Sequence, residues 1–97
     1  WIQTDGKYSN SGKFAGMGNN QMLCANPRTG EISRFLVGPK ECEITGITWS
    51  SDKKTMFVGV QHPGEKNPDS CHFPDGGNSV PRSTVIAITR NNGRAIG

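Results

Sequence analysis

The chain has 97 residues, of which 32% are hydrophobic and 20% are charged, and its formal net charge is +3. The basic residues are scattered and aromatic residues make up only 7%, so we expect no nucleic-acid partner. No apolar run approaches the ~20 residues that cross a bilayer, so we expect no membrane partner either. The 13 glycines are roughly twice the usual share of a globular protein, which favours short strands joined by tight turns.

The first part of the chain predicts three β-strands, over residues 1–4, 21–26 and 32–37. Between the second and the third, Pro27 fixes φ for a turn and Gly30 accepts a positive φ, so these two strands form a hairpin. The first strand starts at the first residue, without a methionine, which indicates a piece of a longer protein.

The second part predicts three further strands, over residues 44–49, 55–61 and 84–89. A polar turn joins the first two, and an Asn-Asn-Gly turn follows the third. Residues 62–82 contain four prolines and almost no apolar periodicity, so we expect a long loop there, a kind of segment that often carries function. No segment shows sustained helical periodicity, and the expected fold class is all-β.

An internal repeat underlies these strands. The motif Ile2-Gln3-x-x-Gly6 recurs as Val60-Gln61-x-x-Gly64. A repeat of about 60 residues made of β-hairpins is typical of propeller blades that carry loop insertions.

We therefore expect a fragment of a β-propeller with about two antiparallel blades. Residues 1–37 would form a partial blade with strands b, c and d, counted outward from the propeller axis. Residues 38–97 would form a second partial blade with strands a, b and c, and with the long loop over residues 62–82. An ordinary six-stranded β-sandwich is the alternative, and the repeat favours the blades.

Blade geometry predicts that three connections share one face, because the d-to-a and b-to-c connections of meandering blades emerge on the same side. These connections are residues 5–20, 38–43 and 62–82. The opposite face receives only tight turns, so we expect any site on the loop face. The chemically active side chains of the loop face are Asp5, Glu41, Glu43, His62, Glu65, Asp69, His72, Asp75 and Arg82.

Glu43 is the leading candidate for a site residue, because it immediately precedes the innermost predicted strand, near the axis on which several blades converge. A hard cation such as Ca²⁺ takes six to eight oxygen ligands, which one blade cannot supply alone. The alternative is a carboxylate bonded to backbone amides at the start of a strand, and the residues by themselves favour that interpretation.

Three cysteines, an odd number without a C-x₂-C pair, do not make a disulfide framework. We expect Cys24 to be a small buried residue of its strand, whereas Cys42 and Cys71 could be bridged or free. His62, His72 and Cys71 lack the spacing of a tetrahedral metal site, so we interpret the histidines as loop residues held by hydrogen bonds or water.

Several segments together carry a family signature. In chain order they are Trp1-Ile2-Gln3-Thr4-Asp5-Gly6, Gly18-Asn19-Asn20-Gln21-Met22-Leu23-Cys24, Cys42-Glu43-Ile44-Thr45-Gly46, Gln61-His62-Pro63-Gly64-Glu65 and Pro81-Arg82-Ser83. In this order and spacing they resemble the C-terminal part of the PhoX-type alkaline phosphatases. The resemblance implies a six-bladed propeller of exported bacterial phosphomonoesterases, periplasmic or secreted, with calcium and iron ions in the central channel. Residues 66–80 depart from the pattern, and no role is carried onto them.

The resemblance also implies roles for individual residues. Glu43 would be a metal ligand, and Asp5, Gln61, His62 and Arg82 would line the same face. The parent protein would be a metal-dependent phosphomonoesterase with a phosphomonoester substrate. The fragment itself would be inactive, would bind no ion tightly, and would self-associate through its open sheet edges. A non-catalytic β-propeller binding or structural module is the alternative, since a fold does not fix a function.

Overall fold

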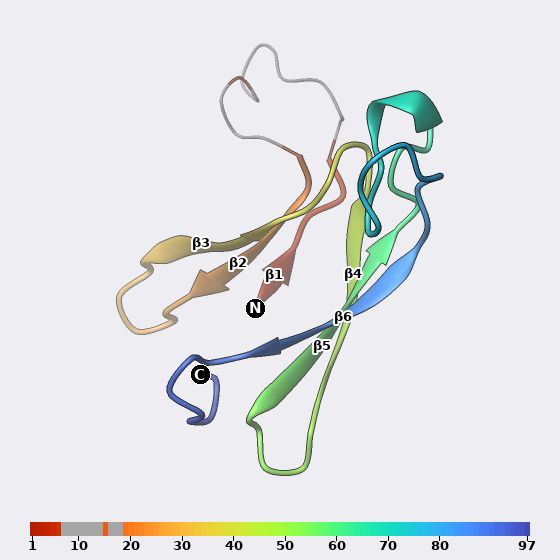
Figure 1. Ribbon diagram of the computed structural model, residues 1–97. Coiled ribbons are helices and arrows are strands. Elements are labelled where there is room, and N and C mark those ends of the chain that lie inside the picture. The colour runs from red at the N-terminus through yellow and green to blue at the C-terminus, as the bar shows by residue number, and fades with distance from the viewer. Residues whose placement is uncertain (7–14, 16–18) are drawn as a thin grey trace.

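The computed structural model describes residues 1–6, 15 and 19–97. These residues form six β-strands and one short 3₁₀ helix, and no α-helix. They make two antiparallel three-stranded sheets, β1-β2-β3 and β4-β5-β6 (Figure 1). The predicted all-β fold is confirmed. In chain order the elements are β1 (Ile2–Gln3), β2 (Gln21–Ala25), β3 (Ile32–Val37), β4 (Glu43–Trp49), β5 (Thr55–Gln61), η2 (Pro68–Ser70) and β6 (Thr84–Thr89).

The observed strand bounds follow the turn residues and the alternation of the sequence. β3, β5 and β6 have the predicted bounds, and β2 ends one residue early. β4 starts at Glu43 rather than at Ile44, because Glu43 pairs with Gln61 at the end of β5. Glu43 is therefore the first residue of the sheet, not the last residue of the connection before it.

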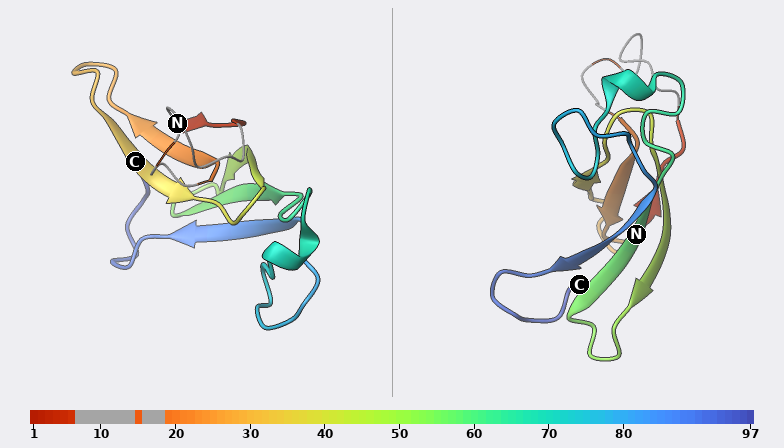
Figure 2. Two further views of the ribbon diagram at one scale, coloured as in Figure 1. Left: turned by 90° about the horizontal axis from the view of Figure 1, so that it is seen from above. Right: turned by 45° about the vertical axis from the view of Figure 1, so that its right-hand side comes forward.

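The core lies between the two sheets. Alternate residues of β5 are buried, so one face of the second sheet is turned inward. Met22 of β2 joins this core from the first sheet, and Figure 2 shows the sheets from above as two separate layers. The buried residues of the core cluster are Met22, Cys42, Ile44, Met56, Val58 and Val60.

The outer face of each sheet leaves apolar side chains uncovered. Val85 on β6 is 71% exposed and Ile32 on β3 is 58% exposed. Two hollows of about 260 and 330 Å³ on the second sheet share Thr45, Gly59 and Val85 in their lining. These faces have the chemistry of surfaces that pack against further protein.

The longer connections gather at one end of the sheets (Figure 1). The β3–β4 connection and the loop over residues 62–82 lie at this end, and the turns between β2 and β3 and between β4 and β5 lie at the other. Residues 7–14 and 16–18 of the predicted loop 5–20 lie outside the described residues. In the described part of the chain, no helix has the length and apolar character needed to span a membrane.

Cys24 is exposed, so the prediction that it is buried was wrong. Cys24 pairs with Ser33 toward the turn end of β2, beyond the part of the strand that packs into the core cluster with Met22. Cys42 and Cys71 are buried free thiols. Burial raises the pKa of the Cys42 thiol to about 11, and the neighbouring Cys71 adds to the rise.

Candidate functional site

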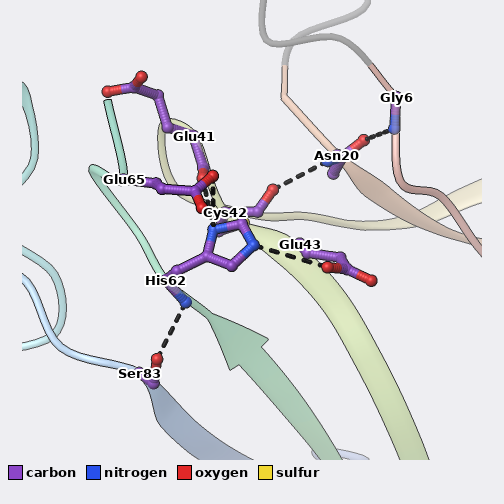
Figure 3. A network of polar contacts seen from close by, with 8 residues as sticks. All are labelled: Gly6, Asn20, Glu41, Cys42, Glu43, His62, Glu65 and Ser83. Atoms are coloured by element: carbon purple, nitrogen blue, oxygen red, sulfur yellow. Dashed lines mark hydrogen bonds and ion pairs between the residues drawn. The ribbon is translucent and has the colours of Figure 1, made fainter. Parts of the chain in front are cut away.

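His62 and Glu43 meet at the loop end of the β4–β5 hairpin. The antiparallel register pairs Glu43, the first residue of β4, with Gln61, the last residue of β5. His62 follows with a φ of 42°, a left-handed backbone that turns the chain out of the strand. Its Nε2 lies 3.5 Å from Glu43 Oε2 (Figure 3). Strand pairing thus brings together two residues that the sequence analysis placed on one face.

Oxygen atoms lie close to both ring nitrogens of His62. Nδ1 is 3.1 Å from the carbonyl oxygen of Glu41 and 3.5 Å from Glu65 Oε2. Partial burial by itself would lower the pKa of this imidazole, but backbone hydrogen bonds at His62 and Glu41 outweigh that effect. The carboxylates of Glu65 and Glu43 add to them, so the pKa of His62 is raised. The site therefore favours the cationic form of the ring.

Glu41 uses its carboxylate to hold the long loop. Its Oε1 accepts hydrogen bonds from the backbone N–H of Asn67 at 3.0 Å and from Ser70 Oγ at 3.3 Å, at the two ends of the η2 turn. Its φ of 61° is left-handed, which is uncommon for residues other than glycine. With this backbone, the Glu41 carbonyl reaches His62 while the side chain reaches the loop. The carboxylate of Glu41 is therefore engaged in structure.

Asn20 connects the two sheets next to this site (Figure 3). Its Nδ2 donates to the carbonyl oxygen of Cys42 at 2.9 Å, which belongs to the residue before Glu43. Its Oδ1 accepts from the backbone N–H of Gly6 at 2.6 Å. Asn20 was not among the predicted site residues, because an asparagine after a glycine-rich stretch has no local signal that separates a buried amide from a turn residue.

The other predicted site residues are placed differently. Gln61 is exposed and lines the hollow of about 260 Å³ on the second sheet. Arg82 forms an ion pair with Asp75, with 2.5 Å between Nη2 and Oδ2. Asp5 is exposed beyond the end of β1. Glu43 and His62 are thus two predicted site residues whose side chains the structure brings together.

The carboxylate of Glu43 has the chemistry of one ligand in a hard-cation site. The side chain is 28% exposed and offers carboxylate oxygens, which Ca²⁺ prefers. Among the described residues, no group of three or more His, Cys, Asp and Glu side chains could hold a metal ion. Because Ca²⁺ takes six to eight oxygens, the remaining ligands of such a site would have to come from outside these residues.

Comparison with known proteins identifies the family. A family model described as "Alkaline phosphatase PhoX" matches residues 1–64, which is more than half of the chain. The chain belongs to the PhoX family. The matched residues include Asn20, Glu43 and His62, so the contacts described above lie inside the PhoX match. No curated protein matches the chain.

A solved structure extends the PhoX match to nearly the whole chain. The structure of "Pseudomonas fluorescens PhoX in complex with vanadate, a transition state analogue" is 61% identical to this chain with a TM-score of 0.91. The match covers 99% of this chain and 16% of that chain. The predicted fold class, an all-β fragment of a larger β-propeller, is confirmed, whereas the division into blades at residues 1–37 and 38–97 stays a prediction.

Proposed function

We propose that this PhoX chain is part of a metal-dependent phosphomonoesterase. The observation that carries the proposal is its 61% identity to a PhoX protein solved with vanadate, a transition state analogue. Vanadate can take the five-coordinate geometry through which a phosphoryl group is transferred, and enzymes bind that geometry more tightly than the substrate. Because the chain spans 16% of the Pseudomonas chain, the activity is proposed for the whole protein, and this segment alone would be inactive.

Glu43 is the residue of this chain that we propose as a metal ligand, with calcium and iron as the ions. When bound, such ions neutralise phosphate charge and lower the pKa of a bound oxygen nucleophile. The His62 ring contacts the carboxylate, with 3.5 Å between Nε2 and Glu43 Oε2, and so restrains its orientation. Pairing with Gln61 holds the backbone of Glu43 in the sheet, so that the carboxylate is presented at the loop end.

Asp5, Gln61 and Arg82 are proposed to line the same face. The Arg82 guanidinium is 61% exposed and already paired with Asp75, so it would exchange that partner to contact a phosphate. We propose a phosphomonoester as the substrate of the parent protein. We also propose a periplasmic or secreted location, which rests on the PhoX resemblance.

Release of p-nitrophenol from p-nitrophenyl phosphate by the full-length protein tests this function. We expect activity that a chelator abolishes. Glu43→Gln removes the charge but keeps the shape, and it should lower both activity and bound metal. Glu31→Gln is the matched control, because Glu31 is exposed in the turn before β3, at the other end of the sheets.

Two outcomes would contradict the proposal. A full-length protein that hydrolyses no phosphomonoester with any added metal would support the alternative, a non-catalytic binding or structural module. Normal activity and metal content in Glu43→Gln would remove Glu43 from the site, without deciding the function of the protein.

A further inference from the structure

Asn20 bonds three segments that are distant in the sequence. Its backbone carbonyl accepts from the N–H of Gly38 at 2.9 Å, just after β3. Its side chain accepts from Gly6 and Thr4, just after β1, and donates to Cys42, just before β4. The residue is only 5% exposed, so these bonds replace water that it has lost. One side chain therefore joins the first sheet to the start of the second.

The partners fix the orientation of the Asn20 amide. The N–H of Gly6 can only donate and must face the side-chain oxygen, whereas the carbonyl of Cys42 can only accept and must face the NH₂ group. An aspartate has the same shape but no NH₂ group. Asn20→Asp would therefore keep the Gly6 contact and place an oxygen against the Cys42 carbonyl. This replaces one attractive contact with a repulsive one at nearly the same side-chain volume.

Cys42 is held on several sides. Its exposed fraction is 0%, and a Cβ added at Gly38 would lie 2.3 Å from its sulfur. Its N–H donates to the carbonyl of Pro39 at 3.4 Å, and its own carbonyl accepts from Asn20. This carbonyl belongs to the planar peptide group that ends at the Cα of Glu43. The Asn20 bond therefore restrains the orientation of the peptide plane next to the Cα atom that carries the Glu43 side chain.

We propose that Asn20 is a positioning residue for the Glu43 carboxylate, acting through the Cys42 peptide group. It restrains the backbone of Glu43 from one side, while His62 contacts the carboxylate from the other at 3.5 Å. The inference rests on the proposed role of Glu43 as a metal ligand. Such ligands must be held within about 0.5 Å of their productive geometry, so a small shift of the Cys42 peptide group weakens ion binding.

Calcium binding by the full-length protein, stripped of metal with a chelator, tests the inference. The probe is Ca²⁺ alone, and the readout is its dissociation constant from titration calorimetry, with the melting temperature of the metal-free protein measured in parallel. We expect Asn20→Asp to weaken Ca²⁺ binding by about 10- to 100-fold. Thr4→Val is the matched control. It removes the 3.2 Å bond to Asn20 Oδ1 and the 2.8 Å bond that Thr4 Oγ1 accepts from the Gln21 N–H, but it leaves the Cys42 contact, and it should change the constant less than about twofold.

Glu43→Gln separates failure of the inference from failure of the proposed function. If Glu43→Gln binds Ca²⁺ like the wild type, the ligand role fails and the positioning role fails with it. If Glu43→Gln loses affinity but Asn20→Asp does not, only the positioning role is overturned. Equal losses of affinity in Asn20→Asp and Thr4→Val would also overturn it, because the effect would then follow general packing of the sheets.

A second variant covers the case in which Asn20→Asp does not fold. Asn20→Ser keeps a hydroxyl but is too short to reach the Cys42 carbonyl, and it should weaken Ca²⁺ binding in the same way. If neither variant yields folded protein, Asn20 is required for folding, and the inference as stated is overturned.

Discussion

Gly38 lies so close to Cys42 that a methyl group on it would fall 2.3 Å from the cysteine sulfur and 2.8 Å from the Ile44 side chain. Both neighbours are buried, so neither can move aside at low cost. We expect Gly38→Ala to destabilise the protein by about 1–3 kcal/mol, the usual cost of overpacking a core. The midpoint of urea unfolding measures it.

Gly6→Ala is the control for this overpacking. A Cβ at Gly6 would meet only Asn20 Oδ1 at 3.5 Å, which is ordinary contact, so we expect a much smaller change. Equal midpoints for Gly38→Ala and the wild type would show that the connection before β4 can move away from the sheet.

Cys24 and Cys42 should differ in reactivity. In the folded 97-residue chain at pH 8, we expect Cys24 to react quickly with a maleimide and Cys42 to be protected, because a pKa of about 11 leaves on the order of one thiolate in a thousand. Mass spectrometry of labelled peptides identifies the site. Cys24→Ser should abolish the fast phase, and rapid native labelling of Cys42 would contradict its burial.

Asp52 links stability to pH at the β4–β5 turn. Its carboxylate accepts hydrogen bonds from the Ser50 hydroxyl, which has the larger effect, and from the Lys54 N–H. These contacts lower the pKa of Asp52 below 3.8. Since the folded pKa lies below the unfolded one, the ionised form stabilises the fold above the unfolded pKa, and this contribution is lost as the pH falls through the folded pKa.

We therefore expect Asp52→Asn to unfold at lower urea than the wild type at pH 7, with the difference shrinking below pH 3.8. Ser51→Ala, at an exposed neighbouring position, is the control. A difference between Asp52→Asn and wild type that stays the same from pH 7 to pH 2 would show that the carboxylate charge contributes nothing.

The isolated chain should self-associate. The open edges of both sheets can pair with a strand of a second copy. The exposed Val85 offers an apolar contact to that copy. We expect the weight-average mass in sedimentation equilibrium to rise with concentration, and Val85→Lys to reduce the rise more than Asn92→Lys in the last turn. A mass that stays monomeric at every concentration would contradict this prediction.

Local signals determine most of the fold, whereas the site depends on contacts between distant residues. Turn residues and alternation were enough to predict β3, β5 and β6, because strand ends are set within a few residues. The start of β4 was misplaced because Glu43 is paired only through Gln61. Asn20 was missed because its partner Cys42 is brought near only when two sheets pack.

The left-handed backbone of Glu41 and His62 lowers the stability of the fold at two positions next to Glu43. Each conformation costs a branched or long side chain on the order of 1–3 kcal/mol that a glycine would not lose. Glycine would remove this cost at both positions, but at 62 it would also remove the ring that contacts Glu43, and at 41 the carboxylate that binds Asn67 and Ser70. The strained backbone at Glu41 and His62 is therefore the cost of side-chain contacts that glycine could not make.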